Sequence, residues 1–359
     1  MADRLHHVQS GIDGAAAPHP REIRMPTKET HVALAHGNGG RYMRELIEQL
    51  FAARLGNPAL DTSLDAATVP TLPPGDLVVT TDGFTVHPLE FPGGNIGSLS
   101  VHGTVNDLAV AGALPQYITL NAFIEEGTEI ALLERLVDAM AQAARDSGVA
   151  VIAGDTKVVR RGEADGVYFA TTGLGIRPHT LHLGMDGIHA GDRLLISGSV
   201  GDHGAAVLLA REEFGFHGTL RSDAGSVLAA AQALWRVPGL RFMRDPTRGG
   251  LATVANEIAR KTALCLRLNE EHIPVSDPVQ SVCEMLGYDP LYLASEGRLV
   301  AVVAPDTAMQ ALEALAQTGA APRLIGELTD EPAQVILQTE FGGERVLEEL
   351  EDDPLPRIC

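Results

Sequence analysis

Short apolar runs and apolar residues at helical spacing take turns along the first half of the chain. The runs predict strands, expected at 32–35, 76–82, 116–125, 149–157 and 166–176. Apolar residues three and four positions apart predict amphipathic helices, one after residue 40 and one over 128–146. A third helical stretch runs from 97 to 112. Such alternation of strands and helices is typical of an α/β domain.

The same alternation resumes after a stretch poor in apolar residues, 177–191, which indicates a connection between domains. Further strands are expected at 192–199, 298–304, 323–327 and 333–339, and helices up to residue 214, at 279–286 and at 306–318. We therefore divide the chain into a first domain at 31–180, a second at 181–342 and a mobile tail at 343–359. Residues 1–30 show no periodicity and are predicted to be a disordered leader.

The composition supports two domains and excludes several classes of function. A chain of 359 residues is longer than one hydrophobic core usually organises. Its formal net charge of −20 argues against a general binder of nucleic acid or anionic membranes. We expect no membrane span and no secretory segment. Three cysteines give no disulfide framework, so a soluble cytoplasmic protein is expected.

A glycine-rich loop, His-Gly-Asn-Gly-Gly at 36–40, is a first candidate for binding chemistry. It stands between a predicted strand and a predicted helix, the order in which backbone N–H groups surround a phosphate. It lacks the Lys-Ser/Thr ending of a P-loop. A phosphate cradle and an ordinary glycine turn are equally compatible with this pattern.

Three aspartates next to apolar segments form a second candidate site. Asp82 ends a Thr-Thr-Asp motif, Asp107 follows Asn106 within a predicted helix, and Asp155 lies in Gly-Asp-Thr-Lys at 154–157. Because Mg²⁺ binds a few carboxylate oxygens together with substrate phosphates, this set favours a metal–nucleotide site. The alternative is that each acid is a turn residue or a helix cap.

Asp245 and Arg248 precede a double glycine at 249–250 that opens a predicted helix. A helix start of this type binds anions. Asp245 and Arg248 then serve a metal and a phosphate or, alternatively, simply hold the turn together. Other histidines and cysteines show no ligand spacing and are expected to be structural: His102, His203, His217, Cys265 and Cys283.

The chain ends in Pro-Leu-Pro-Arg-Ile-Cys, residues 354–359. A terminal cysteine places a thiol at the freest point of a polypeptide, and alternate prolines favour an extended, semi-rigid approach. Leu355 and Ile358 are candidates to anchor the segment in an apolar groove, and Arg357 to bind a carboxylate or phosphate. We interpret the tail as a probe that presents Cys359; the alternative is a frayed end that happens to stop at cysteine.

Nine motifs together resemble the HypE family of hydrogenase maturation proteins, over about residues 32–359. Ser295 and Gly83 depart from the residues that family members often have there, Asn and Ser, and neither change removes a proposed ligand. The internal motifs mark a wider superfamily with aminoimidazole ribonucleotide (AIR) synthetase and selenophosphate synthetase, and the terminal motif is specific to HypE. The motifs are HGNGG (36–40), TTD (80–82), FPGGNIG (91–97), GTVNDLA (103–109), GDTKVV (154–159), GDHG (201–204), DPTRGGLA (245–252), ASEG (294–297) and PRIC (356–359).

The resemblance implies an AIR synthetase-like α/β fold of two domains with mixed sheets, flanking helices and a flexible C-terminal tail. The N-terminal domains are expected to pair into a homodimer, with ATP and Mg²⁺ held near that interface. It also implies an ATP-dependent dehydratase. A partner, HypF, places a carboxamide on the terminal thiol, dehydration yields a thiocyanate, and the cyanide passes to iron on the HypC–HypD complex for a [NiFe] hydrogenase.

The resemblance further implies roles for the candidate residues. Cys359 carries the carboxamide and then the cyanide. Lys157 neutralises charge on the transferring phosphoryl group or orients the carboxamide, and Glu257 and Glu296 are candidates for proton removal. Gly37, Asn38, Gly39 and Gly40 are expected to contact phosphates. The other expected nucleotide and metal contacts are Asp82, Asn106, Asp107, Asp155, Thr156, Asp245 and Arg248, with the metal held by the four aspartates.

Two other classes of function are compatible with the sequence. A phosphotransferase or synthetase of the same superfamily, such as selenophosphate synthetase or thiamine phosphate kinase, acts on a free small molecule. The terminal Cys359 and the lack of a reactive cysteine near the N-terminus count against selenophosphate synthesis. A non-enzymatic scaffold uses the tail only to dock on partners, and the set of acids with Lys157 argues against that function.

Overall fold

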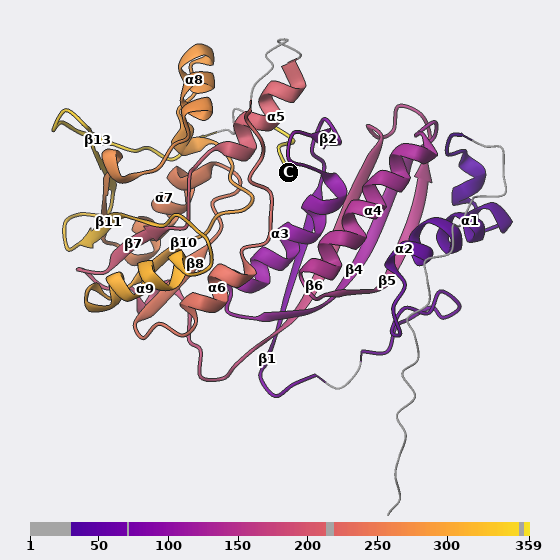
Figure 1. The fold of residues 1–359 in the computed structure, drawn as a ribbon, viewed down its shortest axis with the longest axis horizontal. Helices are drawn as coiled ribbons and strands as arrows, with labels where there is room; N and C mark the ends of the chain where they lie inside the picture. The colour runs from indigo at the N-terminus through magenta and orange to yellow at the C-terminus, as the bar shows by residue number, and fades with distance from the viewer. Residues whose placement is uncertain (1–29, 70–71, 213–218, 352–354) are drawn as a thin grey trace, which may run out of the picture.

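The computed structural model describes residues 30–69, 72–212, 219–351 and 355–359, which form two α/β domains side by side (Figure 1). The N-terminal domain contains a four-stranded sheet and the C-terminal domain a seven-stranded sheet. Both sheets carry helices, which confirms the predicted fold class. The predicted leader lies, except for Thr30, outside the described residues.

The N-terminal sheet has the strand order β1 (Asp76–Phe84), β6 (Val167–Arg177), β4 (Leu114–Glu125) and β5 (Ala150–Val159), with only β4 and β5 parallel. Two helices, α3 (Ile96–Val110) and α4 (Ile130–Asp146), cover one face (Figure 1). On the opposite face of β1, Leu77 is 55% exposed and Val79 is 57% exposed. The apolar run at 76–82 is therefore an edge strand with one exposed face, not the buried strand that its composition predicts.

The segment that precedes β1 differs from the prediction. Residues 32–35 do not form a strand, because Leu34–Gly37 form the 3-10 turn η1. The N–H of Ala33 donates to Nδ1 of His36 at 3.0 Å, and this local bond competes with strand pairing. The predicted helix follows in three consecutive pieces, α1 (Arg41–Leu46), η2 (Ile47–Ala52) and α2 (Ala53–Leu55).

The C-terminal sheet is enclosed between two helical layers. Leu194 and Ile196 of β7 (Arg193–Ile196) lie in the core that α7 (Gly250–Thr262) covers, whereas Leu195 faces α6 (Leu228–Leu234) and α9 (Ala308–Ala316). The run at 192–199 is thus apolar on both faces, as a central strand requires. The strand order is β13 (Glu344–Val346), β12 (Val335–Gln338), β9 (Cys265–Asn269), β11 (Arg323–Thr329), β7, β10 (Val300–Val303) and β8 (Leu240–Arg244), and the helices are α6, α7 and α9.

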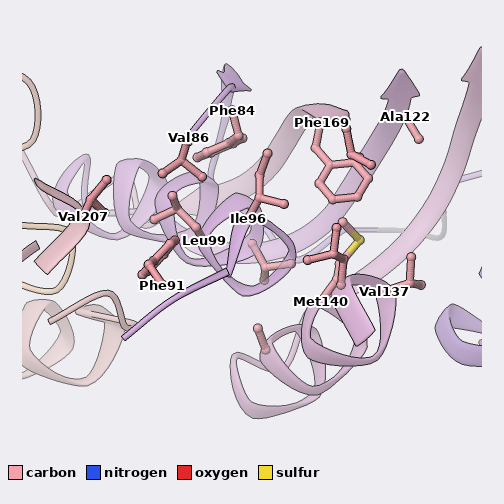
Figure 2. Packing of buried hydrophobic residues seen from close by; sticks show 14 of the residues in the cluster. Phe84, Val86, Phe91, Ile96, Leu99, Ala122, Val137, Met140, Phe169 and Val207 are labelled. Atoms are coloured by element: carbon pink, nitrogen blue, oxygen red, sulfur yellow. The ribbon is translucent and has the colours of Figure 1, made fainter. Parts of the chain in front are cut away.

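The two domains share one apolar core. Helices α5 (Asp202–Glu212) and α8 (Asp277–Leu286) come from the C-terminal half of the chain but contribute to the core of the N-terminal domain. Figure 2 shows Val207 of α5 pointing toward Val86, Phe91 and Leu99. A continuous core of this kind fixes the position of the domains, because relative motion would expose apolar surface.

The C-terminal sheet extends past the predicted boundary at residue 342. Strand β13 pairs with β12, and the N–H of the fully buried Leu347 donates to the carbonyl of Val335 at 2.9 Å. Residues 344–347 therefore belong to the domain and not to a mobile tail.

Candidate active site

Four acidic side chains converge between the domains, each from a different element. Asp82 lies on β1 and Asp107 on α3, where Thr80 donates its hydroxyl hydrogen to Oδ2 of Asp107 at 2.6 Å. Asp245 follows β8, and Glu296 lies in the loop before β10. Burial raises the pKa of all four carboxyls, and repulsion from neighbouring acids adds to the effect at Asp82, Asp245 and Glu296.

Glu296 is buried, with an exposed fraction of 2%, and its Oε1 has no hydrogen-bond partner among the described residues. Burial and then the charge of Asp245 raise the pKa of Glu296 well above its ordinary value. At Asp245, burial and the charge of Asp107 raise the pKa to about 7. A carboxyl whose pKa is raised in this way is suited to proton transfer.

Two arginines border the acids. The positive charge of Arg248 opposes the raised pKa values of Asp82 and Asp107. Nη1 of Arg244 pairs with Oε2 of Glu257 at 2.7 Å. Glu257 therefore positions Arg244, and this ion pair counts against its predicted role in proton removal.

The side-chain amide of Asn106 is fully engaged in hydrogen bonds within the chain. The side chain is completely buried, and Nδ2 donates to the carbonyls of Gly225 at 2.9 Å and Glu296 at 3.0 Å. Its Oδ1 accepts from the N–H of Val227 at 2.8 Å. These bonds use both amide hydrogens. Asn106 thus ties α3 to the C-terminal domain and holds the backbone at Glu296, while its contact with a nucleotide stays a prediction.

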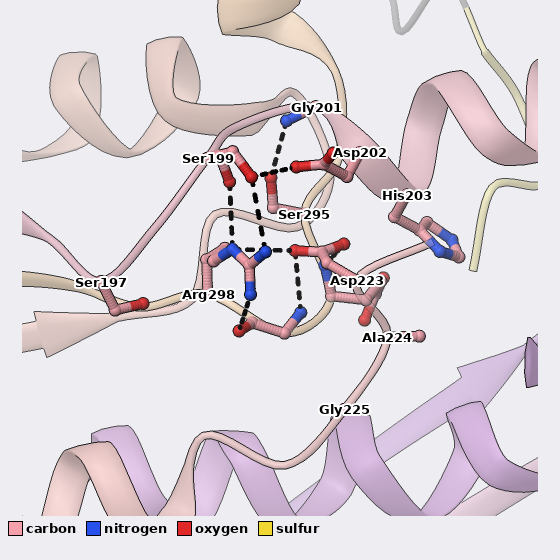
Figure 3. A network of polar contacts seen from close by, with 12 residues as sticks. Ser197, Ser199, Gly201, Asp202, His203, Asp223, Ala224, Gly225, Ser295 and Arg298 are labelled. Atoms are coloured by element: carbon pink, nitrogen blue, oxygen red, sulfur yellow. Dashed lines mark hydrogen bonds and ion pairs between the residues drawn. The ribbon is translucent and has the colours of Figure 1, made fainter. Parts of the chain in front are cut away.

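Figure 3 shows a polar network around Asp223 and Arg298, and this network fixes the loop before β10. Asp223 accepts from the N–H of Glu296 at 3.1 Å and of Gly297 at 3.3 Å, and lies 3.6 Å from Nε of Arg298. Burial raises the pKa of Asp223 to about 6, although Arg298 opposes the shift. A Cβ at position 297 would lie 1.8 Å from the Asp223 carbonyl oxygen, so glycine is required there. Sequence reasoning missed Asp223, since it belongs to no motif and its partners are far away in the chain.

Asp155 and Lys157 lie on β5, at the opposite edge of the sheet from Asp82. Three strand spacings separate these edges, about 14 Å. Nζ of Lys157 pairs with Oδ2 of Asp155 at 2.8 Å, and both side chains are about half exposed. Thr156 between them is buried. One chain therefore does not bring Asp155, Thr156 or Lys157 to the acids at Asp82.

The glycine loop lies at the same edge as Lys157. A Cβ at Gly37 would approach that of Val158 to 2.8 Å, so the loop packs directly on β5. Gly39 has a φ of +76°, and no atom lies within 4 Å of a Cβ built there or at Gly40. The loop is exposed at the β5 edge of the sheet, and the N–H of Gly39 donates to Sδ of Met43 at 3.2 Å.

The last five residues are docked, so the predicted flexible tail is held in this structure. Thr85 donates its N–H to the Cys359 carbonyl oxygen at 2.9 Å, and His87 donates to that of Arg357 at 3.3 Å. Leu355 and Ile358 are buried in the shared core, which confirms their predicted anchoring role, and Cys359 packs against it. Because Thr85 follows β1 directly, docking brings Cys359 to the end of the strand that carries Asp82.

Arg357 holds the docked tail through its side chain. Its Nη1 donates to Oδ2 of Asp165 at 2.8 Å, and its Nε donates to the carbonyl of Thr85 at 3.0 Å. The guanidinium also lies over the ring of Tyr168, 5.6 Å from the centroid. Arg211 of α5 donates to the Arg357 carbonyl at 2.9 Å. The prediction that Arg357 binds a carboxylate is confirmed.

The acids fit Mg²⁺ in the company of a phosphate. Asp82, Asp107 and Asp245 offer hard carboxylate oxygens, and burial raises the pKa of each although the charge of Arg244 or Arg248 opposes the shift. Among the described residues, there is no group of three or more His, Cys, Asp or Glu side chains that could hold a metal ion by itself. Mg²⁺ keeps several water and phosphate ligands, so one or two protein carboxylates are enough for it.

Both domains match known families. Residues 63–177 match the N-terminal domain, and residues 189–338 the C-terminal domain, of AIR synthase related proteins. The fold, the two matched domains and the acids between them define the class as a two-domain AIR synthase related protein. None of the described helices combines the length and apolar character that crossing a membrane requires.

The relatives narrow this class. Carbamoyl dehydratase HypE of Azotobacter vinelandii is 47% identical over 341 residues, which cover 94% of this chain and 99% of that protein. A crystal structure of the hydrogenase maturation protein HypE in complex with ATP has a TM-score of 0.86 at 41% identity, covering 91% of this chain and 99% of that one. A crystal structure of a HypE–HypF complex has a TM-score of 0.74 at 39% identity, covering 85% of this chain and 99% of that one. The chain belongs to the HypE family of hydrogenase maturation proteins.

Proposed function

We propose that this chain is an ATP-dependent carbamoyl dehydratase that converts a carboxamide on its own Cys359 into a thiocyanate. The names of its relatives support the reaction. The contact of the Cys359 carbonyl oxygen with the Thr85 N–H, 2.9 Å long, supports the identity of the acceptor. It holds the carrier residue where β1 ends, at the strand that carries Asp82, so a carboxamide on the thiol and a nucleotide on the acids meet between the domains.

The reaction turns an amide oxygen into a leaving group. The carboxamide oxygen attacks the γ-phosphorus of ATP, the bond from that phosphorus to the bridging oxygen breaks, and ADP leaves. The nitrogen loses one proton, which gives an O-phosphorylated imidate. Loss of the second nitrogen proton and cleavage of the C–O bond release phosphate and form the nitrile. Carboxamide and ATP thus yield thiocyanate, ADP, phosphate and a proton, and the work of the site is positioning and charge neutralisation.

Glu296 is the residue that we assign to proton removal. Its Oε1 has no partner among the described residues, and its raised pKa makes it a strong base once it is ionised. Asn106 and Asp223 hold the backbone on both sides of its Cα, which limits its movement. Glu257, occupied by Arg244, lacks this freedom.

Asp82, Asp107 and Asp245 would hold Mg²⁺, and Arg248 beside them would bind a phosphate of ATP. The metal, when bound, neutralises phosphate charge and polarises the γ-phosphoryl group. Thr80 orients Asp107 for this task by its 2.6 Å hydrogen bond. Burial of Asp245 supports the same assignment, since a buried carboxylate without a cation is unfavourable.

We infer that a second copy completes the site. Leu77 and Val79 expose an apolar edge of the sheet that a partner copy would cover. Asp155 and Lys157 lie on β5 away from Asp82, together with the glycine loop at 37–40, as expected for residues that serve the nucleotide of a neighbouring subunit. In this homodimer Lys157 of one copy neutralises the phosphoryl group bound by the acids of the other.

HypF is the partner that we propose for loading the carboxamide, supported by the complex of a relative with that protein. The HypC–HypD complex is the proposed acceptor of the cyanide for the iron of a [NiFe] hydrogenase. A cytoplasmic location follows from the carrier chemistry, because the thiol of Cys359 has to stay reduced to accept a carboxamide.

Peptide mass spectrometry tests this function. The chain is incubated with HypF, carbamoyl phosphate and ATP, and a Cys359→Ser variant serves as the control. We expect a carboxamide on Cys359 after loading with limiting ATP, and loss of one water from the same peptide when Mg-ATP is supplied to the loaded protein after removal of the small molecules. An unmodified Cys359 in a chain that still hydrolyses ATP would contradict the proposal and indicate a free small-molecule acceptor.

A further inference from the structure

His203, at the start of α5, contacts the tail at its penultimate residue. Its Nε2 lies 2.7 Å from the Ile358 carbonyl oxygen, and the imidazole is fully buried. A carbonyl oxygen only accepts, so Nε2 carries the hydrogen and donates it. Nδ1 then accepts, and the hydroxyl of Ser222, 2.7 Å away, is its donor. Burial lowers the pKa of His203 to about 4, in accord with this neutral ring.

Ser222 is itself held in place from two sides. Its Oγ accepts from the N–H of Ala224 at 2.9 Å, and its N–H donates to the Pro92 carbonyl at 2.7 Å. Gly93 must be glycine, because a Cβ there would lie 2.7 Å from the Ser222 carbonyl oxygen. The Phe91 ring packs edge-on against the imidazole at 5.3 Å. The Phe-Pro-Gly-Gly motif, which has no part in the reaction described above, thus builds a socket around His203 and Ser222.

The socket is continuous with the loop of Glu296. Asp223, the neighbour of Ser222, accepts from the N–H groups of Glu296 and Gly297. Gly225 is bonded to Asn106, which also holds the Glu296 carbonyl. A short segment, 222–225, therefore contacts the docked tail through His203 at one end and the backbone of Glu296 at the other.

We propose that His203 is a positioning residue for the C-terminal carrier segment, and that Ser222 fixes the tautomer in which His203 binds the Ile358 carbonyl. This inference rests on the proposed function only for the identity of Cys359 as the carrier. His203 and Ser222 together recognise a peptide carbonyl. A replacement for His203 that places an N–H donor at the Nε2 position should therefore keep part of the tail binding. The segment 222–225 links occupation of this site to the position of Glu296.

Tail release can be measured without any reaction. Trypsin cleaves after arginine, and the bond after Arg357 is protected while its side chain binds Asp165 and Thr85. The full-length chain is exposed briefly to trypsin, quenched and digested with a glutamate-specific protease. Peptides that end at Arg357 are then counted against those that end at Cys359. The variants are His203→Leu, His203→Gln and Ser222→Ala, with His102→Leu as a matched control that removes a partly buried histidine outside the tail site.

We expect His203→Leu to speed cleavage after Arg357 about tenfold, since it leaves a buried carbonyl without its donor. His203→Gln, which retains an N–H at the Nε2 position, should stay within about threefold of the wild-type rate. Ser222→Ala should lie between them, and His102→Leu should match the wild type. Equal rates for His203→Leu and the wild type, or for His203→Leu and His203→Gln, would overturn the proposal. If His203→Leu does not fold, an unchanged rate in Ser222→Ala would overturn it.

A second measurement tests the link to Glu296. Chains loaded with carboxamide beforehand are given saturating Mg-ATP, and water loss is followed in a single turnover. His203→Leu should slow this step while the ATP affinity stays unchanged, and His203→Gln should restore most of the rate. An unchanged rate in His203→Leu would overturn the link. The trypsin assay measures tail release and needs no dehydration. A chain that lacks dehydratase activity would therefore fail the second measurement without changing the result of the first.

Discussion

At the scale of single residues, Glu296 carries the clearest chemical assignment. Its Oε1 is buried without a partner among the described residues, and Glu257, the other candidate base, is paired with Arg244. Glu296→Gln keeps the volume but cannot accept a proton, so we expect dehydration to slow by about 10²- to 10⁴-fold. ATP binding should change little. Single-turnover mass spectrometry of the loaded peptide and calorimetric ATP titration measure the two effects.

Glu257→Gln is the matched control for this experiment. It loses the ion pair with Arg244 but leaves the proposed base intact, so its dehydration rate should fall by less than about tenfold. A larger defect in Glu257→Gln than in Glu296→Gln would reverse the two roles.

The pKa of His203 predicts a pH dependence of stability. Burial lowers this pKa from 6.5 to about 4, so the folded chain binds the proton more weakly than the unfolded chain. The resulting stability is fully present above the unfolded pKa and is lost as the pH falls toward the folded pKa. Between about pH 7 and pH 4, the wild type should therefore lose about 3 kcal/mol relative to His203→Gln. Urea unfolding of both proteins across this range measures the difference; parallel curves would contradict it.

The sequence predicts the roles of some of these residues from their own chemistry and from their neighbours in the chain. Arg357 is predicted to bind a carboxylate or phosphate because its guanidinium offers a fixed fork of donors, and it binds Asp165. Asn106 stands beside Asp107 in a motif, and adjacency alone assigned it to the same ligand. Adjacent residues on a helix point about 100° apart, however, and Asn106 faces the C-terminal domain instead.

At the scale of elements, α3 is the joint between the domains, because Asn106 bonds to three backbone groups of the C-terminal half. Asn106→Ala leaves these buried groups unpaired and should lower the free energy of unfolding by about 3 kcal/mol. It should also slow dehydration, since the backbone of Glu296 loses its support. Urea unfolding and the single-turnover assay test both effects.

Asn256→Ala is a suitable control for the joint. Asn256 donates to the carbonyls of Ala252 and Leu347, both within the C-terminal domain. This variant should lose stability but keep the dehydration rate. Equal effects of the two variants on the rate would show that Asn106 acts only through stability.

The spacing of apolar residues predicts most of the helices and strands, and each wrong or missing prediction has a physical cause. Helix α4 keeps a strong apolar stripe and was expected within two residues of its observed ends. The run at 32–35 is as apolar as a strand but is closed into a turn by His36. Helix α6 was missed because its two turns are largely alanine and show little periodicity.

At the scale of the whole molecule, the predicted site residues of one chain lie at two opposite edges of the N-terminal sheet. The sequence grouped Asp155 with Asp82 by motif, but the sheet separates them by its full width, a separation that only the strand order reveals. If two copies complete the site, Asp82→Asn and Asp155→Asn should each be inactive alone. Mixed dimers contain one intact site, so co-expressed variants should recover about a quarter of the wild-type activity.

The pair Asp82→Asn and Asp107→Asn is the control for this complementation. Both residues lie in the same acid cluster of one chain, linked through Thr80, so mixing them should restore no activity. Recovery in this control, or none with Asp155→Asn, would contradict a site shared between copies.

In the proposed reaction, the chain consumes ATP to dehydrate the carboxamide on its docked Cys359. The most direct measurement follows phosphate release and the mass of the terminal peptide in one sample of pre-loaded protein. We predict one phosphate released for each Cys359 peptide that loses water, and neither event with a non-hydrolysable ATP analogue. Water loss without phosphate, or steady phosphate release from a peptide that keeps its carboxamide, would contradict the account.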